Sequence, residues 1–413
     1  ESDRHMCKDC DQYDLHYAAG SGVSRRHVLD RLAMGGLAAM LSGLPASSRA
    51  AEEDETVRIG YLPITDATPL LVAHAKGYFE EEGLKVARPE LIRGWAPLIE
   101  GFSAGRFNVV HLLKPTALWL RYGSKVPVKV VAWAHTNGSA LVVQGDGGVK
   151  TFADLAGKRL AVPFWYSMHN IVLQYALRKS GLTPVIKPQD ALLGPKEVNL
   201  QIIQPPDMPP ALAAKKIDGY IVAEPFDALG ELNASARVLR FTGDIWKNHP
   251  CCVVSMLQPL IEKRPEWAQK VVNAIVRAEI YASQNKAEVA QLLSREGAAY
   301  LPAPAKVVTR AVTAYAQEPA YKDVIRHPDW GNGRIDFQPW PYPSATRLIV
   351  QQLKETKIEG DRVFLDKLDP DFVTKDLVDY TLVRKALDRY PDWRRDKSVA
   401  TGDPFNRQEV LAL

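Results

Sequence analysis

Residues 159–170 read RLAVPFWYSMHN and place a short apolar segment directly before a turn and the start of a helical pattern. The first four residues predict a strand, and the apolar spacing from about Ser167 to Lys179 predicts a helix. A strand that runs through a short turn into a helix is the repeating unit of α/β proteins, so this stretch predicts that fold class. Taken by itself, His169 at the predicted helix start is compatible with a catalyst, a metal ligand, a clamp for a small ligand or a core histidine.

The same alternation continues on both sides of this stretch. Further strands are predicted over residues 57–62, 84–87, 109–113, 128–133, 140–143 and 219–222, with helices over about 68–78 and 210–216. The glycine-rich segment 145–148 interrupts the alternation, which then restarts. The pattern predicts two lobes with mostly parallel sheets, and such folds bind ligands near the carboxyl ends of their strands.

The C-terminal third has helical spacing instead. Helices are predicted over residues 266–284, 287–293, 305–317 and 341–355. We therefore expect residues 52–143 to form the first part of lobe 1 and residues 144–250 to form lobe 2. Residues 251–413 should return to lobe 1 and add a helical C-terminal extension.

Composition limits the possible partners. The chain has 413 residues, 46% hydrophobic content and a net charge of +4, which are ordinary values for a globular protein. Lysines and arginines do not cluster among aromatic residues, so a nucleic acid partner is not supported. A small anion suits the mild positive charge better.

The N-terminal segment resembles a twin-arginine export signal. Arg25 and Arg26 precede an apolar run over residues 32–44 and a small-residue stretch over 46–51. Val28 and Asp30 stand where that signal usually has phenylalanine and lysine. The alternative is an amphipathic surface helix, but few acidic residues interrupt the run. Residues 1–50 are therefore predicted to direct the protein to a bacterial periplasm, and the run is too short to span a bilayer.

The four cysteines fall into two pairs. Cys7 and Cys10 form a CxxC motif upstream of the twin arginines, and a single CxxC without a second pair is not a zinc site. Cys251 and Cys252 are adjacent within an apolar run. Neighbours in a strand point to opposite faces, so a disulfide between them would be strained, and buried small hydrophobic side chains are the expectation.

No familiar catalytic motif occurs in the predicted mature region. The sequence lacks GxSxG, P-loop, HExxH and paired CxxC patterns. Its histidines have no pair at metal-ligand spacing; they are His74, His111, His135, His169, His249 and His327. We therefore predict a binding protein with no catalytic residues, no metal and no cofactor.

Three stretches resemble a known family. Residues 61–84, 152–162 and 218–226 are similar to motifs of the nitrate/sulfonate/bicarbonate-type substrate-binding proteins of ABC transporters and their thiamine-precursor relatives. Within that superfamily the likeness is to the nitrate and bicarbonate branch; it rests on residues 94–96, 168–170, 243–250 and 337–343. The resemblance implies a type II periplasmic binding protein fold, in which a hinge links two lobes.

The resemblance also implies a ligand site. In that branch a tryptophan, an amide, a histidine and a lysine surround the oxyanion, and the matching positions are Trp95, Asn137, His169 and Lys247, with asparagine in place of the family's glutamine. Trp95 could instead be a core aromatic, and Lys247 a solvated surface lysine. His169 could instead cap or pack at a helix start.

Two further residues are candidates from their positions. Lys114 follows an apolar strand directly, so the end of the strand would deliver its ammonium group to the cleft. Glu224 precedes Pro225 and should belong to the wall or the hinge, where its carboxylate would hold neighbouring donors or balance a cation.

The sequence thus predicts a monomeric periplasmic receptor that closes around a small oxyanion or small organic anion and docks on the permease of an ABC importer. Two alternatives stay open. One is an enzyme or precursor binder resembling the thiamine pyrimidine synthases of the same superfamily, and the other is a ligand receptor that serves a sensor protein.

Overall fold

A computed structural model describes residues 56–313, 318–330, 333–395 and 403–413. The predicted export signal lies outside these residues. Within them, no helix is long and apolar enough to cross a membrane.

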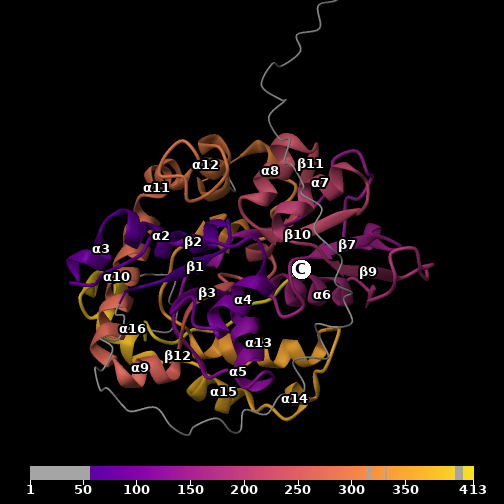
Figure 1. Cartoon of the computed structure of the whole chain (residues 1–413). Helices are drawn as coiled ribbons and strands as arrows, with labels where there is room; N and C mark the ends of the chain where they lie inside the picture. Colours follow the sequence, from indigo (N-terminus) through magenta and orange to yellow (C-terminus); the bar gives the residue numbers. More distant parts are fainter. Residues whose placement is uncertain (1–55, 314–317, 331–332, 396–402) are drawn as a thin grey trace, which may run out of the picture. The chain divides into compact units, whose positions relative to one another are not determined.

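Two mixed sheets form the core (Figure 1). The first sheet has the order β2-β1-β3-β12-β4; its strands are β1 (Ile59–Tyr61), β2 (Glu90–Leu91), β3 (Val109–Leu113), β4 (Val128–Trp133) and β12 (Cys252–Leu257). The second has the order β11-β6-β10-β7-β9-β8; its strands are β6 (Ser139–Gln144), β7 (Arg159–Val162), β8 (Thr183–Val185), β9 (Glu197–Ile202), β10 (Gly219–Ala223) and β11 (Ala236–Phe241). The predicted α/β class is confirmed.

The sheets are less parallel than the sequence predicts. In the first sheet β12 runs antiparallel to β3 and β4, and in the second β6 runs antiparallel to β10 and β11. Both β6 and β12 directly follow a crossing between the sheets that contains no α-helix. Neither strand is joined to its sheet neighbours by a strand–helix–strand crossover, which is the connection that produces parallel pairs.

The opening stretch folds as predicted. Residues 159–162 form β7, and α6 spans Met168–Lys179. The helix begins there because the Ser167 hydroxyl accepts a hydrogen bond from the amide of Asn170 at 3.0 Å, which satisfies a donor in the first turn. Leu173, Ala176 and Leu177 then face the core.

Two local predictions are wrong. Residues 84–87 form no strand, since only Val86 makes an isolated bridge, to Val57, and the strand beside β1 is Glu90–Leu91. The helix expected over 68–78 divides into α2 (Thr68–Ala75) and α3 (Tyr78–Glu81). Gly77 lies between them at φ 72°, a left-handed conformation that glycine adopts without strain and that ends α2.

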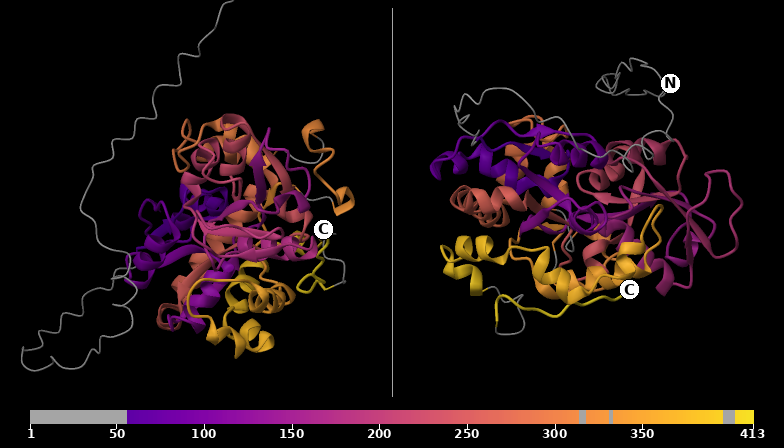
Figure 2. Two further views of the ribbon diagram at one scale, coloured as in Figure 1. Left: turned by 90° about the vertical axis from the view of Figure 1, so that its right-hand side faces the viewer. Right: turned by 60° about the horizontal axis from the view of Figure 1, so that its bottom comes forward.

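Helices cover both sheets. Those that follow strands are α4 (Trp95–Ser103), α5 (Lys114–Tyr122), α7 (Met208–Ala213) and α8 (Phe226–Asn233). The C-terminal helices are α9 (Gln258–Lys263), α10 (Pro265–Gln284), α11 (Lys286–Leu293), α12 (Ala305–Thr313), α13 (Pro343–Glu355), α14 (Val363–Asp366), α15 (Pro370–Asp376) and α16 (Tyr380–Leu387). Of these, α10 packs on α2, and α16 packs on α10 and β4, so the yellow C-terminal part lies beside the first sheet in Figure 2.

Two short crossings join the sheets. The first crossing, residues 134–138, runs from β4 in the first sheet to β6 in the second, and the second crossing, residues 242–251, runs from β11 back to β12. The expected boundary at residues 143/144 falls one strand later than the first crossing. The crossings pair with each other: Thr136 bridges Pro250, and the amide of Asn137 donates to the carbonyl of His249 at 2.9 Å. We propose that the chain forms two lobes and that these two crossings are the hinge between them.

Candidate functional site

Buried polar residues gather where the crossings meet the ends of the strands. The 3-10 turn Thr65–Ala67 follows β1, and the Thr65 amide donates to the carbonyl of Glu224 at 2.8 Å. The Glu224 amide in turn donates to the carbonyl of Gly138 at 3.0 Å. These bonds hold the ends of β1 and β10 against the first crossing, so one buried region receives side chains from both sheets.

His169 lies in the first turn of α6 and belongs to a hydrogen-bonded chain. Its Nε2 contacts the Ser139 hydroxyl at 2.9 Å, and Thr242 links the Ser139 carbonyl to Nε2 of His249 through bonds of 2.9 and 2.7 Å. Nδ1 of His169 has no hydrogen-bond partner among the described residues. Burial, followed by the nearby His249 and His135, lowers the pKa of His169 to about 3, so the ring is neutral at pH 7.

Asn137 lies on the first crossing, two residues before Ser139 of this series of hydrogen bonds. Its backbone is left-handed (φ 61°), and its Nδ2 is 3.4 Å from Oδ1 of Asn248. Its Oδ1 has no partner in the described part of the chain. Gly243 makes room for this side chain, because a Cβ at that position would lie 2.6 Å from Cγ of Asn137.

Trp95 begins α4 and is almost fully buried. Its ring packs edge-on against His111 on β3, with the ring centroids 5.6 Å apart. Its indole Nε1 finds no acceptor within the described ranges. A buried indole N–H normally has an acceptor, so Trp95 presents an unsatisfied donor.

The two candidate lysines contact other parts of the chain. The Lys114 ammonium donates to Oγ1 of Thr346 on α13 at 2.6 Å and lies 5.0 Å from the Trp133 ring centroid, and burial lowers its pKa to about 7. The Lys247 amide pairs with the carbonyl of Val410, and its side chain is half-buried. Among the described residues neither ammonium group has a recorded contact with His169.

Glu224 is fully buried beside Arg334. Its Oε1 lies 2.7 Å from Nε of Arg334, and its Oε2 accepts from the amide of Ala228 at 3.0 Å. Burial raises the pKa of Glu224 to about 7, although Arg334 opposes this shift. Arg334 also pairs with Glu231 at 2.8 Å, so the carboxylate belongs to a buried ionic network behind the first crossing.

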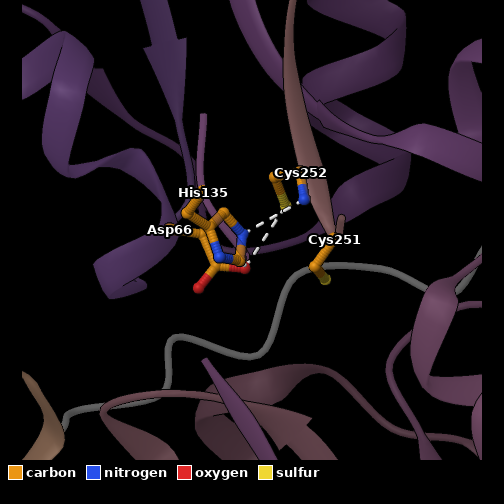
Figure 3. A group of neighbouring side chains, drawn as sticks. All are labelled: Asp66, His135, Cys251 and Cys252. Atoms are coloured by element: carbon orange, nitrogen blue, oxygen red, sulfur yellow. Dashed lines mark hydrogen bonds and ion pairs between the residues drawn. The ribbon is translucent and has the colours of Figure 1, made fainter. Parts of the chain in front are cut away.

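Sequence reasoning missed a second group of side chains in the same region (Figure 3). Asp66, His135, Cys251 and Cys252 each place a potential ligand atom within 4.8 Å of the others. The expectation of no metal site rested on the spacing of histidines and cysteines along the sequence, and that spacing does not show this group. Spacing along the chain did not reveal the group because the sheet and the crossings bring together three distant segments.

The description of both cysteines as small hydrophobic side chains is also incomplete. Both are buried, as expected, and neither forms a disulfide. However, the Cys252 thiol donates to Oδ2 of Asp66 at 3.3 Å. Burial alone would raise the pKa of the Cys251 thiol, but hydrogen bonds with Cys252 and His135 bring that pKa below its ordinary value. One signal could have found the group, since each member adjoins a strand end: Asp66 follows β1, His135 follows β4, and the cysteines lie at the start of β12.

The region offers binding chemistry based on neutral donors. A small anion needs N–H groups that converge in a dry environment, where each hydrogen bond gains strength from the low dielectric constant. Trp95 has a buried N–H group without a described acceptor, and His169 has a buried ring nitrogen without a described partner. Each residue lies in the first turn of a helix, where the helix dipole favours negative charge.

Comparison with known proteins gives a consistent result. A model of the NMT1-like family matches residues 50–294. The chain is 27% identical over 281 residues to the nitrate/nitrite binding protein NrtA of Nostoc sp. (strain PCC 7120), covering 62% of this chain and 61% of that protein. It is 28% identical over 244 residues to the nitrate import ATP-binding protein NrtC of Synechocystis sp. (strain PCC 6803), covering 55% of this chain and 35% of that protein. The chain thus spans less than two thirds of the length of either relative.

A solved structure supports the fold. The periplasmic nitrate-binding protein NrtA from Synechocystis PCC 6803 matches with a TM-score of 0.68 at 18% identity, covering 85% of this chain and 92% of that one. The predicted periplasmic binding protein fold is confirmed.

Proposed function

The chain belongs to the NMT1-like family, and from this premise we propose that it is the periplasmic substrate-binding component of an ABC importer and binds a small oxyanion between its two sheets. The nitrate/nitrite binding protein NrtA among its relatives supports the class of ligand, and the ATP-binding protein NrtC supports the link to an ATP-driven importer. In this proposal a monomer closes at the two crossings and docks on a permease.

One observation carries the ligand proposal. His169 directs Nε2 to Ser139 and has no described partner for Nδ1, although the ring is buried. If the Ser139 hydroxyl donates to Nε2, the proton of the neutral imidazole is on Nδ1, which can then donate to a ligand. A buried donor that the protein itself does not satisfy is costly, and an anion oxygen would satisfy it.

The other candidates take supporting roles. Trp95 would donate from Nε1, and Asn137 would supply its amide. We propose that Glu224 positions the first crossing through its backbone bonds and its pairing with Arg334. Lys114 and Lys247 are less favoured than the other four residues, because the Lys114 ammonium group already contacts Thr346 and the Trp133 ring, and the Lys247 backbone pairs with Val410.

A matched pair of variants tests the role of His169. His169→Gln can keep the contact with Ser139 through its longer side chain but has no group at the Nδ1 position. His169→Asn can place an amide N–H near the Nδ1 position but does not reach Ser139. Isothermal titration with nitrate, nitrite, bicarbonate and methanesulfonate would compare both variants with the unmodified chain.

We expect His169→Gln to raise the Kd of the bound anion by roughly 10- to 100-fold, because a hydrogen bond to a charged group is worth about 1.5–3 kcal/mol. His169→Asn should raise the Kd of the anion by a smaller factor. The proposal fails if no anion in the panel binds to the unmodified protein, or if the glutamine variant binds as tightly as that protein does.

A further inference from the structure

Asp66, His135, Cys251 and Cys252 form a compact cluster of potential metal ligands. Their ligand atoms all lie within 4.8 Å of one another, and all four side chains are fully buried. Figure 3 shows Asp66, His135 and Cys252 turned toward one another, with Cys251 beside Cys252. Four ligand-type side chains in one dry place are unusual, because burying a carboxylate without compensation is costly.

The hydrogen bonding at His135 is contradictory in a way that points to a cation. Its Nε2 is 3.1 Å from the amide of Cys252, which is a donor, and 2.9 Å from Oδ2 of Asp66, which is an acceptor. A single ring nitrogen can accept from the amide or donate to the carboxylate, but it cannot do both. Oδ1 of Asp66 and Nδ1 of His135 have no hydrogen-bond partner in the part of the chain that the structure describes. Positive charge would resolve the contact between Asp66 and the ring nitrogen, supplied either by a proton on His135, which makes an ion pair with Asp66, or by a metal ion bound in the cluster.

The Cys252 thiol is not placed as a nucleophile activated by His135 and Asp66. In such a triad the carboxylate and the thiol contact opposite nitrogens of the imidazole. Here Asp66 and the amide of Cys252 approach the same nitrogen, and the Cys252 thiol also contacts Asp66. The Cys252 thiol and the His135 ring therefore share one carboxylate oxygen of Asp66.

We propose that Asp66, His135, Cys251 and Cys252 bind a divalent transition-metal ion of the zinc class. Two thiolates, one imidazole and one carboxylate are a ligand set that suits Zn²⁺, which binds such groups tetrahedrally at about 2.0–2.3 Å. Ligands at those distances lie about 3.3–3.8 Å apart, by the geometry of a tetrahedron. The contacts of 2.9 Å (Nε2 to Oδ2) and 3.3 Å (Sγ of Cys252 to Oδ2) need only small adjustments.

The site would join three parts of the chain. Asp66 lies in the 3-10 turn that follows β1, His135 lies near the start of the first crossing, and the cysteines lie at the end of the second. The two crossings already pair through Thr136 and Pro250. A bound ion would fasten both crossings to the first sheet, and with four buried ligands it would have to enter before the protein packs around it. This inference does not depend on the proposed anion function.

Cobalt binding tests the site, because Co²⁺ replaces Zn²⁺ and shows an intense near-ultraviolet absorption only when thiolates bind it. The test uses the full chain with Cys7→Ser and Cys10→Ser, so that Cys251 and Cys252 are the remaining thiols. Metal is supplied both to the native protein and during refolding from denaturant, since burial slows entry. We expect one Co²⁺ per chain with thiolate absorption, and displacement of that ion by Zn²⁺.

Three variants and one control complete the test. Cys251→Ser and Cys252→Ser should each weaken the thiolate absorption and lower the affinity by roughly 100-fold or more, and Asp66→Asn should lower the affinity while keeping the absorption. His327→Gln removes a histidine that stacks on Trp330 outside the cluster and should bind as the parent does. Circular dichroism would confirm that each variant folds.

Absence of thiolate absorption in the folded parent under both loading conditions would overturn the proposal. So would unchanged affinity in the Cys251→Ser/Cys252→Ser double variant, or binding of Cu⁺ without Co²⁺ or Zn²⁺. Anion titration of the same metal-free samples separates the two proposals, because anion binding without metal binding would overturn the metal site alone.

Discussion

Replacing His169 with glutamine removes a buried imidazole whose pKa lies at about 3 in the folded protein, against an ordinary value of 6.5. Below pH 6.5 the unfolded chain takes up a proton at this position and the folded protein does not. The stability due to this difference is therefore complete above pH 6.5 and is lost as the pH falls from 6.5 toward 3. The variant has no such group, so its stability should fall less steeply in acid.

The size of the effect follows from the pKa difference. Each pH unit below 6.5 costs about 1.4 kcal/mol for one proton, so His169 alone should lower the unfolding free energy by about 2 kcal/mol between pH 7.5 and pH 5. At pH 7.5 the variant should be about 1 kcal/mol less stable than the parent, since the imidazole packing is lost. At pH 5 it should be about 1 kcal/mol more stable, and the two curves should cross between these values.

Urea unfolding followed by tryptophan fluorescence between pH 5 and pH 7.5 measures both curves. All other titrating groups are shared, so their contributions largely cancel in the difference between the two proteins. Ser139→Ala is the matched control, because it removes the hydrogen bond to Nε2 but keeps the imidazole, and its curve should run parallel to that of the parent. A difference between the glutamine variant and the parent that stays constant across this pH range would refute a buried neutral His169.

Three further outcomes follow from the contacts at the other candidate residues. Trp95→Phe removes a buried N–H that lacks a described acceptor, so thermal melting without ligand should show no loss of stability. Titration of the same variant should show a roughly 10-fold higher Kd for the anion. Arg334→Met leaves the Glu224 carboxylate buried without its cation and should lower the unfolding free energy by about 3–5 kcal/mol in urea, with part of this restored when Glu224→Gln is added. Lys114→Met should raise the unfolding free energy by up to about 4 kcal/mol at pH 7, because burial lowers the lysine pKa from 10.5 to about 7 and the unfolded chain therefore binds a proton that the folded protein holds less tightly. The gain should fall as the pH rises, to less than about 1 kcal/mol at pH 10, because the unfolded lysine also loses its proton there.

Local apolar patterns predicted much of the fold. Strand β7 and helix α6 follow from contiguous residues, because a buried strand needs an unbroken apolar run and a helix start needs a capping residue such as Ser167. The wrong predictions fall where tertiary contacts, and not the local sequence, determine the secondary structure. Residues 84–87 have a strand-like composition, yet only Val86 pairs, whereas the polar Glu90 lies beside β1.

The candidate site was harder to predict for a related reason. Asn137, His169 and Glu224 come together because their segments adjoin the crossings. Lys114 contacts Thr346, which lies 232 residues further along the chain, and no local pattern shows that α13 would pack there. The pairing of β12 between β3 and β4 likewise brings Cys252 to His135, and neither segment contains a signal for that register.

Charge links the two proposed sites. Two thiolates and one carboxylate around a divalent ion, with a neutral imidazole, leave a net charge of −1 at the ends of the first sheet's strands. His135 and His169 influence each other's protonation, so the proposed anion donor lies within electrostatic range of that charge. An oxyanion at His169 would be repelled by the loaded metal site, and because coupling between two ligands is reciprocal, each should weaken the other. If zinc strengthened anion binding instead, the Asp66 carboxylate could not be a ligand of the metal. An oxygen of the anion would then take its place, and the anion would bind the metal directly.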